Sequence, residues 1–221
     1  MKILITGGAG FIGSHLAEYL TLKKKIKKII IIDNVKDGSI RNLKNCINSK
    51  KVKFYKRDIK NLKKIKNLFR GIDLVFHLAA LSDVVPSIEK PIDYLNTNII
   101  GTVNVLESMR IYNVKKIVYS ASSSCYGIPR KYPTNETEVI DPKYPYAFSK
   151  NLGEQTIAHW AKIYKINFVS LRLFNVYGTR SRTNTAYGAA LGVFLKQKLS
   201  NHPFTIIGDG KQKRDFVHVN D

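Results

Sequence analysis

Residues 1–20 read MKILITGGAGFIGSHLAEYL, and this stretch decides the fold. Met1–Thr6 is an apolar run typical of a buried strand, and the periodicity of Ser14–Leu22 predicts a helix. Between them stand three glycines, spaced three residues apart: Gly7, Gly10 and Gly13. Glycines in such a turn let the backbone bend sharply and approach a pyrophosphate group at a helix N-terminus. The stretch therefore predicts a strand, a turn and a helix that bind a dinucleotide.

An acidic residue follows at the distance that a dinucleotide site requires. The apolar run Ile29–Ile32 ends in Asp33 and Asn34, about twenty residues past the glycine turn. A carboxylate there can bond both ribose hydroxyls and repel a 2′-phosphate, which predicts NAD rather than NADP as the cofactor. Asp58 and Ile59 follow a further short strand, where a carboxylate can reach an adenine amino group, although a solvated loop aspartate is an equally common reading.

Apolar strands and helices alternate along the rest of the chain. Further strands are predicted at Val52–Tyr55, Asp73–His77, Lys116–Tyr119, Phe168–Leu173 and Phe204–Ile207. Helices are predicted at Leu62–Phe69, Ile92–Tyr112, Tyr144–Tyr164 and about Ala186–Leu199, with a loop and a short helix over Val35–Asn48 and loops at Pro86–Pro91, Thr134–Pro142 and Phe174–Gly178. This alternation implies right-handed crossovers and a mostly parallel sheet covered on both faces, which is a doubly wound α/β (Rossmann) fold.

The composition fits one principal domain. A chain of 221 residues with 44% hydrophobic content can bury one substantial core and a second small lobe. We expect an NAD-binding domain over residues 1–175 and part of a small substrate-binding region over 176–221. No apolar run approaches the roughly 18 residues of a membrane span, and Met1–Thr6 reads as a core strand rather than a cleavable signal. Cys46 and Cys125 lack metal-ligand spacing and are too few for a disulfide framework, so we expect no metal site and a cytoplasmic location.

The formal charge of +21 suggests, by itself, nucleic acid or an anionic surface as a partner. The excess is concentrated in residues 1–70, where 19 Lys and Arg stand against 4 acidic residues. The densest run, Lys23–Lys28, lies at the expected end of the first helix, where cations are favourable beside the helix dipole and usually solvated. No aromatic residues interleave with this run to stack bases. We therefore expect no specific nucleic-acid partner and a preference for anionic small substrates.

Groups suited to proton transfer follow one of the predicted strands. Ser120–Gly127 is rich in hydroxyls at the carboxyl end of a strand, where ligands bind in open α/β sheets. Tyr146 and Lys150 are four residues apart on a helix and share one face, so the ammonium group, helped by a nicotinamide cation, should lower the tyrosine pKa from its ordinary value of about 10. Tyr146 could then act as a base while Ser122 holds the same substrate oxygen. His77, on an apolar strand, is expected in the core rather than in catalysis.

Motifs along essentially the whole chain resemble those of one family. They are Thr6–Gly13, Asp33-Asn34, His77–Ala80, Ser122 with Tyr126-Gly127, Tyr146–Lys150, Arg172–Gly178 and Gly208–Asp221. Together they resemble the extended short-chain dehydrogenase/reductases, and among these most the nucleotide-sugar epimerases of the UDP-galactose 4-epimerase type. The resemblance is highly specific for the superfamily and less specific for the substrate.

The resemblance implies roles for individual residues. NAD would be held by Gly7, Gly10, Phe11 and Ile12 at the pyrophosphate, Asp33 and Asn34 at the adenosine ribose, Asp58 and Ile59 at the adenine, and Leu78, Ala79 and Ala80 along the channel. Ser122, Tyr146 and Lys150 would be catalytic, and Tyr146 and Lys150 would also contact the cofactor. The nucleotide sugar would be bound by Ser122, Ser123, Tyr146, Asn175 and Arg214, with the Arg214 guanidinium paired to the diphosphate. A homodimer through Ile92–Tyr112 and Tyr144–Tyr164 is also implied.

The implied reaction is epimerisation at C4 of a UDP-hexose by transient oxidation to a keto sugar and return of the hydride. Family dehydratases commonly carry Asp-Glu where this chain has Ser123-Ser124, which disfavours dehydration. Family members also continue past the position of Asp221, so we expect the chain to be a fragment with part of the substrate domain. The alternatives are a nucleotide-sugar reductase, dehydrogenase or decarboxylase, and a non-catalytic NAD- or nucleic-acid-binding protein. The intact set of Ser122, Tyr146 and Lys150 argues against the non-catalytic alternative.

Overall fold

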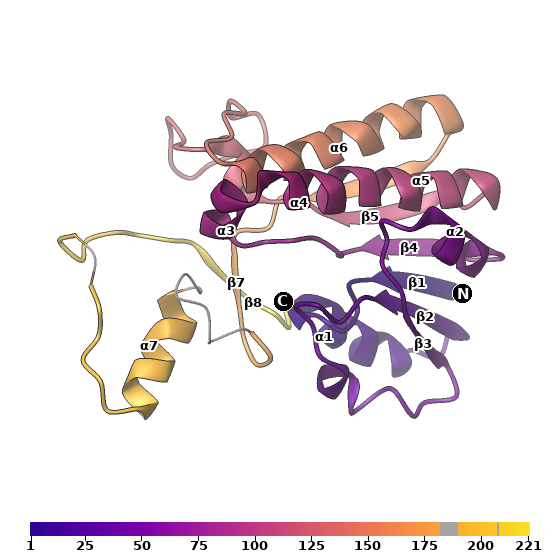
Figure 1. Ribbon diagram of the computed structural model, residues 1–221, viewed down its shortest axis with the longest axis horizontal. Helices are drawn as coiled ribbons and strands as arrows, with labels where there is room; N and C mark the ends of the chain where they lie inside the picture. Colours follow the sequence, from indigo (N-terminus) through magenta and orange to yellow (C-terminus); the bar gives the residue numbers. More distant parts are fainter. Residues whose placement is uncertain (182–189, 207) are drawn as a thin grey trace.

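A six-stranded parallel sheet forms the centre of the computed structural model, which describes residues 1–181, 190–206 and 208–221 (Figure 1). Its strands are β1 (Lys2–Thr6), β2 (Lys28–Asp33), β3 (Val52–Lys56), β4 (Leu74–His77), β5 (Lys116–Ser120) and β6 (Asn167–Leu171). They lie in the order β3-β2-β1-β4-β5-β6, and every neighbouring pair is parallel. The winding reverses between β1 and β4, which confirms the doubly wound α/β fold.

Helical segments connect the strands and cover the sheet. They are α1 (Phe11–Thr21), η1 (Ile40–Leu43), α2 (Leu62–Ile65), η2 (Lys66–Phe69), α3 (Val84–Glu89), α4 (Pro91–Leu95), η3 (Asn96–Ile100), α5 (Gly101–Ile111), η4 (Ser123–Tyr126), α6 (Pro145–Tyr164) and α7 (Ala190–Leu199). Helices α5 and α6 lie on one face of the sheet and α1 on the other (Figure 1). A separate parallel pair is formed by β7 (Asn175–Tyr177) and β8 (Phe216–His218).

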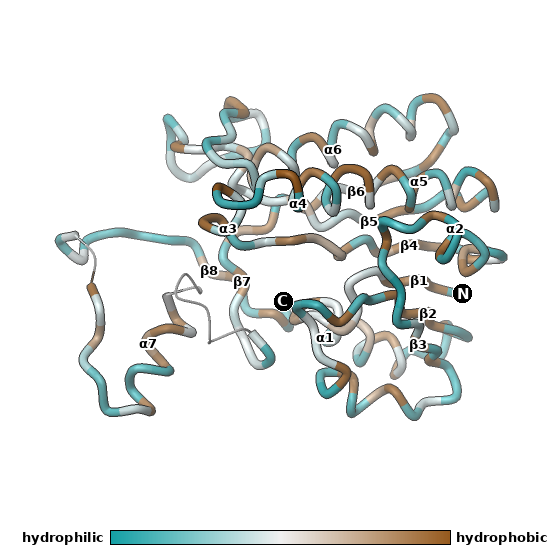
Figure 2. The backbone as a smooth tube through the Cα atoms, in the orientation of Figure 1, coloured by the Kyte–Doolittle hydropathy of each residue, from teal (hydrophilic) through white to brown (hydrophobic). Residues whose placement is uncertain are grey.

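Neighbouring residues of β1 belong to hydrophobic clusters on opposite faces of the sheet. Leu4 is in the cluster that includes Val105 of α5, whereas Ile3 is in the cluster that includes Ala17 of α1. Successive side chains of a strand point to opposite sides, so continuous apolar runs such as Ile29–Ile32 are needed where both faces are covered. Figure 2 shows hydrophobic segments along the central strands and hydrophilic segments along many of the outer loops.

The helix predicted over Ile92–Tyr112 is present as α4, η3 and α5 in uninterrupted succession, and η3 is a single π-helical turn. Asn98 in this turn is 1% exposed. Its amide accepts a hydrogen bond from Leu81 N at 2.8 Å, and donates to Leu81 O at 3.0 Å and to Ser149 Oγ at 2.8 Å. The turn thus ties the segment after β4 to helix α6, both of which reach the site described below.

The loop predicted at Pro86–Pro91 is wrong, because these residues lie almost entirely in α3 and α4. Pro86 is in the first turn of α3 and Pro91 is the first residue of α4. The amide N–H groups of a first helical turn have no partner within the helix, so proline is tolerated there. Proline at these positions indicated helix starts rather than a loop.

Two predictions near the carboxyl end of the chain are also corrected. The polar loop predicted at Phe174–Gly178 contains β7, whose partner β8 lies far along the chain, so no local pattern could reveal it. The strand predicted at Phe204–Ile207 is absent over residues 204–206, and Ile207 lies outside the described residues. The helix predicted at about Ala186–Leu199 is present as α7 from Ala190, and its predicted first residues lie outside the described part.

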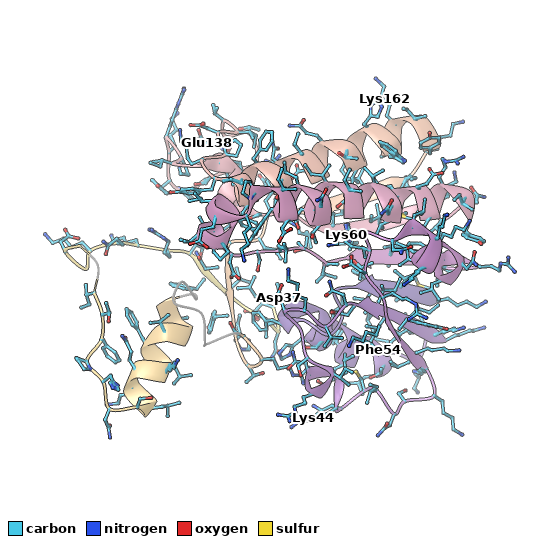
Figure 3. The ribbon with its side chains drawn as sticks, viewed as in Figure 1. Asp37, Lys44, Phe54, Lys60, Glu138 and Lys162 are labelled. Carbon is cyan, nitrogen blue, oxygen red and sulfur yellow. The ribbon has the colours of Figure 1, made fainter. Side chains whose placement is uncertain are left out.

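The excess positive charge lies on solvent-exposed side chains of several elements. All the lysines of Lys23–Lys28 are exposed, whereas Ile26 within this run is buried. Figure 3 shows Lys44 and Lys162 at opposite outer edges of the molecule. Within the described ranges, no helix is long and apolar enough to cross a membrane, and no group of three His, Cys, Asp or Glu side chains could hold a metal ion.

Candidate active site

A cavity of about 800 Å³ opens at the carboxyl ends of the central strands. Its walls include nearly all the residues predicted to bind cofactor or substrate: Gly7, Gly10, Phe11, Ile12, Asp33, Asn34, Asp58, Ile59, Leu78, Ala79, Ala80, Ser122, Ser123, Tyr146, Lys150 and Asn175. The volume is in the range of cavities that bind small molecules, and the position is the switch point of a doubly wound sheet. The sequence pattern and the cavity thus point to the same place.

The glycine turn brings the backbone of β1 close to that of the segment after β4. Gly7 has φ of +72°, and a Cβ atom on it would lie 2.6 Å from the backbone nitrogen of Ala79. A Cβ atom on Gly13 would lie 2.2 Å from the Gly7 carbonyl oxygen. Helix α1 begins at Phe11, and no side chain in the described structure caps its amino end. Its first N–H groups therefore have no side-chain partner among the described residues, and binding of a pyrophosphate there stays a prediction.

The Asp33 carboxylate at the end of β2 is fixed by backbone hydrogen bonds. It accepts from Ala9 N at 2.9 Å and from Val35 N at 2.8 Å. Burial raises the pKa of Asp33, and these two backbone donors act in the opposite direction. Close by, Asn34 Nδ2 donates to Asp58 Oδ2 at 3.1 Å. The three polar residues predicted for the adenosine end are therefore gathered at one end of the cavity.

His77 belongs to the core, as predicted from its strand. It is fully buried, with Nδ1 2.7 Å from Thr6 Oγ1 and Nε2 2.9 Å from Thr102 Oγ1. Burial, helped by the positive charge of Lys150, lowers the pKa of His77 to about 3. Both ring nitrogens have hydroxyl partners, so this side chain is a neutral structural link between β1, β4 and α5.

Ser122, Tyr146 and Lys150 also line the cavity, and Ser122 follows β5, which β1 and β4 separate from β2 and Asp33 in the sheet. Ser122 caps η4, where its hydroxyl accepts from Ser124 N at 3.2 Å and donates to Ser124 Oγ at 3.0 Å. Tyr146 lies in the first turn of α6, and Lys150 one turn later is 4% exposed. The Lys150 ammonium donates to the carbonyl oxygen of Ser120 and lies 4.3 Å from the centre of the Tyr119 ring.

The pKa of Tyr146 is shifted upward in this structure, opposite to the predicted direction, and Lys150 is not among the groups that shift it. Burial raises the pKa of Tyr146, the neighbouring Ser122 hydroxyl lowers it, and the charge of Asp83 raises it. Burial also lowers the pKa of Lys150 to about 7, and Glu154 opposes that shift. The physical reason is desolvation, which disfavours the phenolate and the ammonium ion alike.

The two substrate residues predicted from the last third of the chain differ in position. Asn175 on β7 lines the cavity and donates from Nδ2 to Asp215 O at 2.9 Å. Arg214 is exposed, donates from Nη1 to Lys213 O at 2.8 Å, and is not among the residues that line the cavity. The pairing of Arg214 with a diphosphate stays a prediction.

Some cavity residues were not predicted. Asp83 lies in the segment that directly follows β4, and the rule that ligands bind at the carboxyl ends of strands could have indicated it. Thr97 in the π turn and Arg180 after β7 also line the cavity. Arg180 donates to a carboxylate oxygen of Glu18 on α1, a contact between residues far apart in the chain. No local sequence pattern marks such residues.

The residues that line the cavity suit NAD. The Gly7 turn leaves no room for a side chain beside the Ala79 backbone, and the buried Asp33 carboxylate lines the same cavity. Tyr146 and Lys150 line it too, and there a proton donor and acceptor would meet a reacting carbon. The arrangement therefore suits hydride transfer coupled to proton transfer.

Comparison with known proteins agrees with this geometry. The model of the NAD dependent epimerase/dehydratase family matches residues 3–221. A putative UDP-glucose 4-epimerase from Methanocaldococcus jannaschii is 39% identical over 221 residues, which cover 99% of this chain and 70% of that protein. A dTDP-D-glucose 4,6-dehydratase from Dictyostelium discoideum is 35% identical over 234 residues, which cover 100% of this chain and 53% of that protein.

A solved structure shows the same likeness in three dimensions. The crystal structure of a UDP-glucose 4-epimerase with UDP-glucose from Thermotoga maritima matches with a TM-score of 0.92 and 34% identity, over 100% of this chain and 70% of that one. The family match spans the glycine turn, the Ser122 loop and the helix of Tyr146 and Lys150. The chain therefore belongs to the NAD-dependent epimerase/dehydratase family, whose cofactor is NAD.

Proposed function

We propose that this protein is an NAD-dependent epimerase of nucleotide sugars that acts at C4 of a UDP-hexose. The observation that carries the proposal is the convergence of Ser122, Tyr146 and Lys150 on the cavity that the glycine turn also lines. The substrate class is supported by the names of the relatives, since UDP-glucose 4-epimerases occur among both the similar sequences and the similar structures.

The reaction inverts a C4 hydroxyl without net oxidation or reduction. NAD, when bound, supplies the hydride acceptor, returns the hydride to the sugar carbon and places a positive charge near the phenol. Tyr146 takes the proton of the C4 hydroxyl as the keto sugar forms, and gives a proton back when the hydride returns. Ser122 donates a hydrogen bond to the same oxygen and stabilises the charge that develops there. Because burial raises the pKa of Tyr146, its action as a base depends on the Ser122 hydroxyl, which lowers this pKa, and on the positive charge that the bound cofactor would add.

Dehydration is the second candidate, because a dTDP-D-glucose 4,6-dehydratase is among the similar proteins. Loss of water from a keto sugar needs an additional acid and base beside the sugar ring. This chain has Ser123 and Ser124 where family dehydratases commonly carry Asp-Glu, and neither hydroxyl exchanges protons readily at neutral pH. This difference favours epimerisation.

Two measurements test the proposal. Mass spectrometry of small molecules that remain bound through purification should find NAD and a UDP-sugar. NMR of UDP-glucose incubated with the protein should show UDP-galactose with no consumption of added cofactor. A deoxy keto product would support the dehydratase, and net consumption of cofactor would support a reductase, dehydrogenase or decarboxylase.

We also propose that residues 1–175 bind NAD, that residues 176–221 contribute to the sugar side, and that the protein is a cytoplasmic homodimer without a specific nucleic-acid partner. Support for the dimer comes from exposed apolar side chains on the helices that the resemblance implicates, among them Ile100, Ile111, Phe148 and Ile163. Both cysteines are free, as expected in a reducing compartment. Light scattering of the protein and of Phe148→Asp should show a dimer that dissociates in the variant.

A further inference from the structure

Arg172 lies directly after β6 and contacts three separate parts of the chain. Its Nε is 3.2 Å from both carboxylate oxygens of Glu154, and its Nη2 is 2.7 Å from Oε1 of the same residue. Its Nη1 donates to the hydroxyl of Tyr126 at 2.9 Å and to the carbonyl oxygen of Glu136 at 3.1 Å. One guanidinium group thus joins helix α6, the end of η4 and the loop that connects them.

These contacts surround the proton-transfer groups without belonging to them. Glu154 is one helical turn beyond Lys150 on α6, so its position is fixed relative to Lys150 and Tyr146. Tyr126 is the last residue of η4, the short helix that Ser122 caps. Arg172 is not among the residues that line the cavity. It can therefore act on the reaction only through the elements that it joins.

The bonds of Arg172 to Glu154 and Tyr126 are partly shielded from water, whereas the bond to the Glu136 carbonyl is exposed. The side chains of Arg172 and Glu154 are 21% and 17% exposed, and Tyr126 is 4% exposed. The guanidinium group also lies 5.1 Å from the centre of the Tyr126 ring. A planar guanidinium with several fixed donors can satisfy a carboxylate, a phenol and a carbonyl at once, which a lysine ammonium cannot do with the same geometry.

A backbone bond strengthens the same junction. Ser123 N donates to the carbonyl oxygen of Leu173 at 3.0 Å, so the residue after Arg172 holds the beginning of η4 while Arg172 holds its end. Ser122 approaches Tyr146 from η4, whereas Tyr146 is carried by α6. Their separation therefore depends on how η4 and α6 are aligned.

We propose that Arg172 is a positioning residue that aligns the Ser122 segment with the helix of Tyr146 and Lys150 through its bonds to Tyr126 and Glu154. This inference rests on the proposed function, because it concerns the efficiency of proton transfer in that reaction. A displacement of about 1 Å between reacting groups can lower a rate by about 10²-fold. Loss of Arg172 should therefore lower kcat while leaving NAD binding and KM nearly unchanged.

The experiment compares Arg172→Met and Arg172→Lys with the unmodified protein, using UDP-glucose as the substrate. Arg172→Met should lower kcat by about 10²-fold, with KM and bound NAD within about threefold of the unmodified values. Arg172→Lys keeps a cation beside Glu154 but loses the fork, so it should recover less than about a tenth of the lost kcat. Full recovery with lysine would show that only charge matters and would overturn the proposal.

Arg110→Met is the matched control, because Arg110 forms an ion pair with Glu107 on α5 that is largely exposed. Its kcat should stay within about twofold of the unmodified value. An equal change in kcat for Arg172→Met and Arg110→Met would contradict the positioning role. If the unmodified protein does not turn over any nucleotide sugar, the result contradicts the proposed function. A result that contradicts only the role of Arg172 requires turnover by the unmodified protein, so the two cases can be distinguished.

If Arg172→Met does not fold, Tyr126→Phe still tests the proposal. It removes one hydroxyl and leaves the buried ring in place, so it should lower kcat by several-fold without a change in bound NAD. Combined with Arg172→Lys, it should add little further loss, because both variants break the same link. Fully additive losses in kcat would contradict a shared role.

Discussion

The ammonium group of Lys150 lies 4.3 Å from the centre of the Tyr119 ring and donates to the carbonyl oxygen of Ser120. The ring and the carbonyl oxygen both attract the positive charge of Lys150, whose side chain is almost entirely shielded from water. Burial nevertheless lowers the pKa of Lys150 to about 7, against an unfolded value of about 10.4. The charge on Lys150 is therefore sensitive to pH near neutrality.

The stability of the protein should depend on pH through Lys150. Between about pH 7 and pH 10 the unfolded chain binds more protons than the folded one at this side chain, so folded stability rises with pH across this window. Relative to Lys150→Met, the unmodified protein should gain about 1–3 kcal/mol of unfolding free energy from pH 7 to pH 9. Urea denaturation at both pH values measures the difference. Lys162→Met, at an exposed position on the same helix, keeps Lys150, so the difference in unfolding free energy between it and the unmodified protein should be the same at both pH values.

His77 predicts a loss of stability on the acid side. Its folded pKa of about 3 lies below the unfolded value of about 6.5, so the contribution of His77 is complete above pH 6.5 and declines as the pH falls toward 3. From pH 7 to pH 5 the unmodified protein should lose about 2 kcal/mol relative to His77→Asn, which cannot titrate. Denaturation curves at the two pH values check this. His159→Asn, an exposed position, serves as the control, and an equal slope for both variants would refute the assignment.

Tyr146→Phe should retain NAD but lose turnover. Removal of a general acid and base costs about 10²–10⁴-fold in rate, whereas the ring that lines the cavity remains. Epimerisation is measured by NMR and bound NAD by its absorbance after release. Because burial raises the pKa of Tyr146, kcat of the unmodified protein should also increase with pH on the acid side of its profile. A variant within a few-fold of the unmodified rate would show that Tyr146 is not the base.

Cofactor choice should depend on Asp33. Its buried carboxylate, held by Ala9 N and Val35 N, is positioned to bond a ribose diol and to repel a 2′-phosphate. NAD should therefore bind more tightly than NADP. Asp33→Ala should reduce the difference between the two affinities, mainly because NAD binds this variant more weakly. Isothermal titration of both cofactors measures this. Asp37→Ala, which alters another cavity residue, should preserve the preference, and equal affinities in the unmodified protein would rule out the role of Asp33.

The sequence was sufficient to predict the fold, and every predicted site residue except Arg214 lines the cavity, because the informative patterns were local. The glycine turn, the acid at the end of β2 and the Tyr146–Lys150 spacing on α6 each occupy a short stretch of the chain. Contacts between residues that are far apart in the sequence could not be predicted. The pairing of β7 with β8 and the contact of Arg180 with Glu18 join residues that are far apart in the chain.

The pKa shifts in the site also could not be predicted from the spacing of residues in the sequence. The interval between Tyr146 and Lys150 predicts a shared helix face, but it does not give the degree of burial. Desolvation raises the pKa of Tyr146, and Lys150 is not among the groups that offset it, so this pKa moved upward rather than downward. Arg172 stood inside a recognised motif, yet its role depends on Tyr126 and Glu154, which only the folded chain brings together.

The most direct test of the central claim follows both the sugar and the cofactor in one reaction. Protein purified with its bound NAD is mixed with UDP-glucose labelled with deuterium at C4, and the sugars are analysed by NMR and mass spectrometry. The account predicts UDP-galactose that retains the deuterium at C4, with no net formation of NADH, and no conversion by Tyr146→Phe. Recovery of unchanged UDP-glucose alone, or of a product formed with stoichiometric NADH, would contradict it.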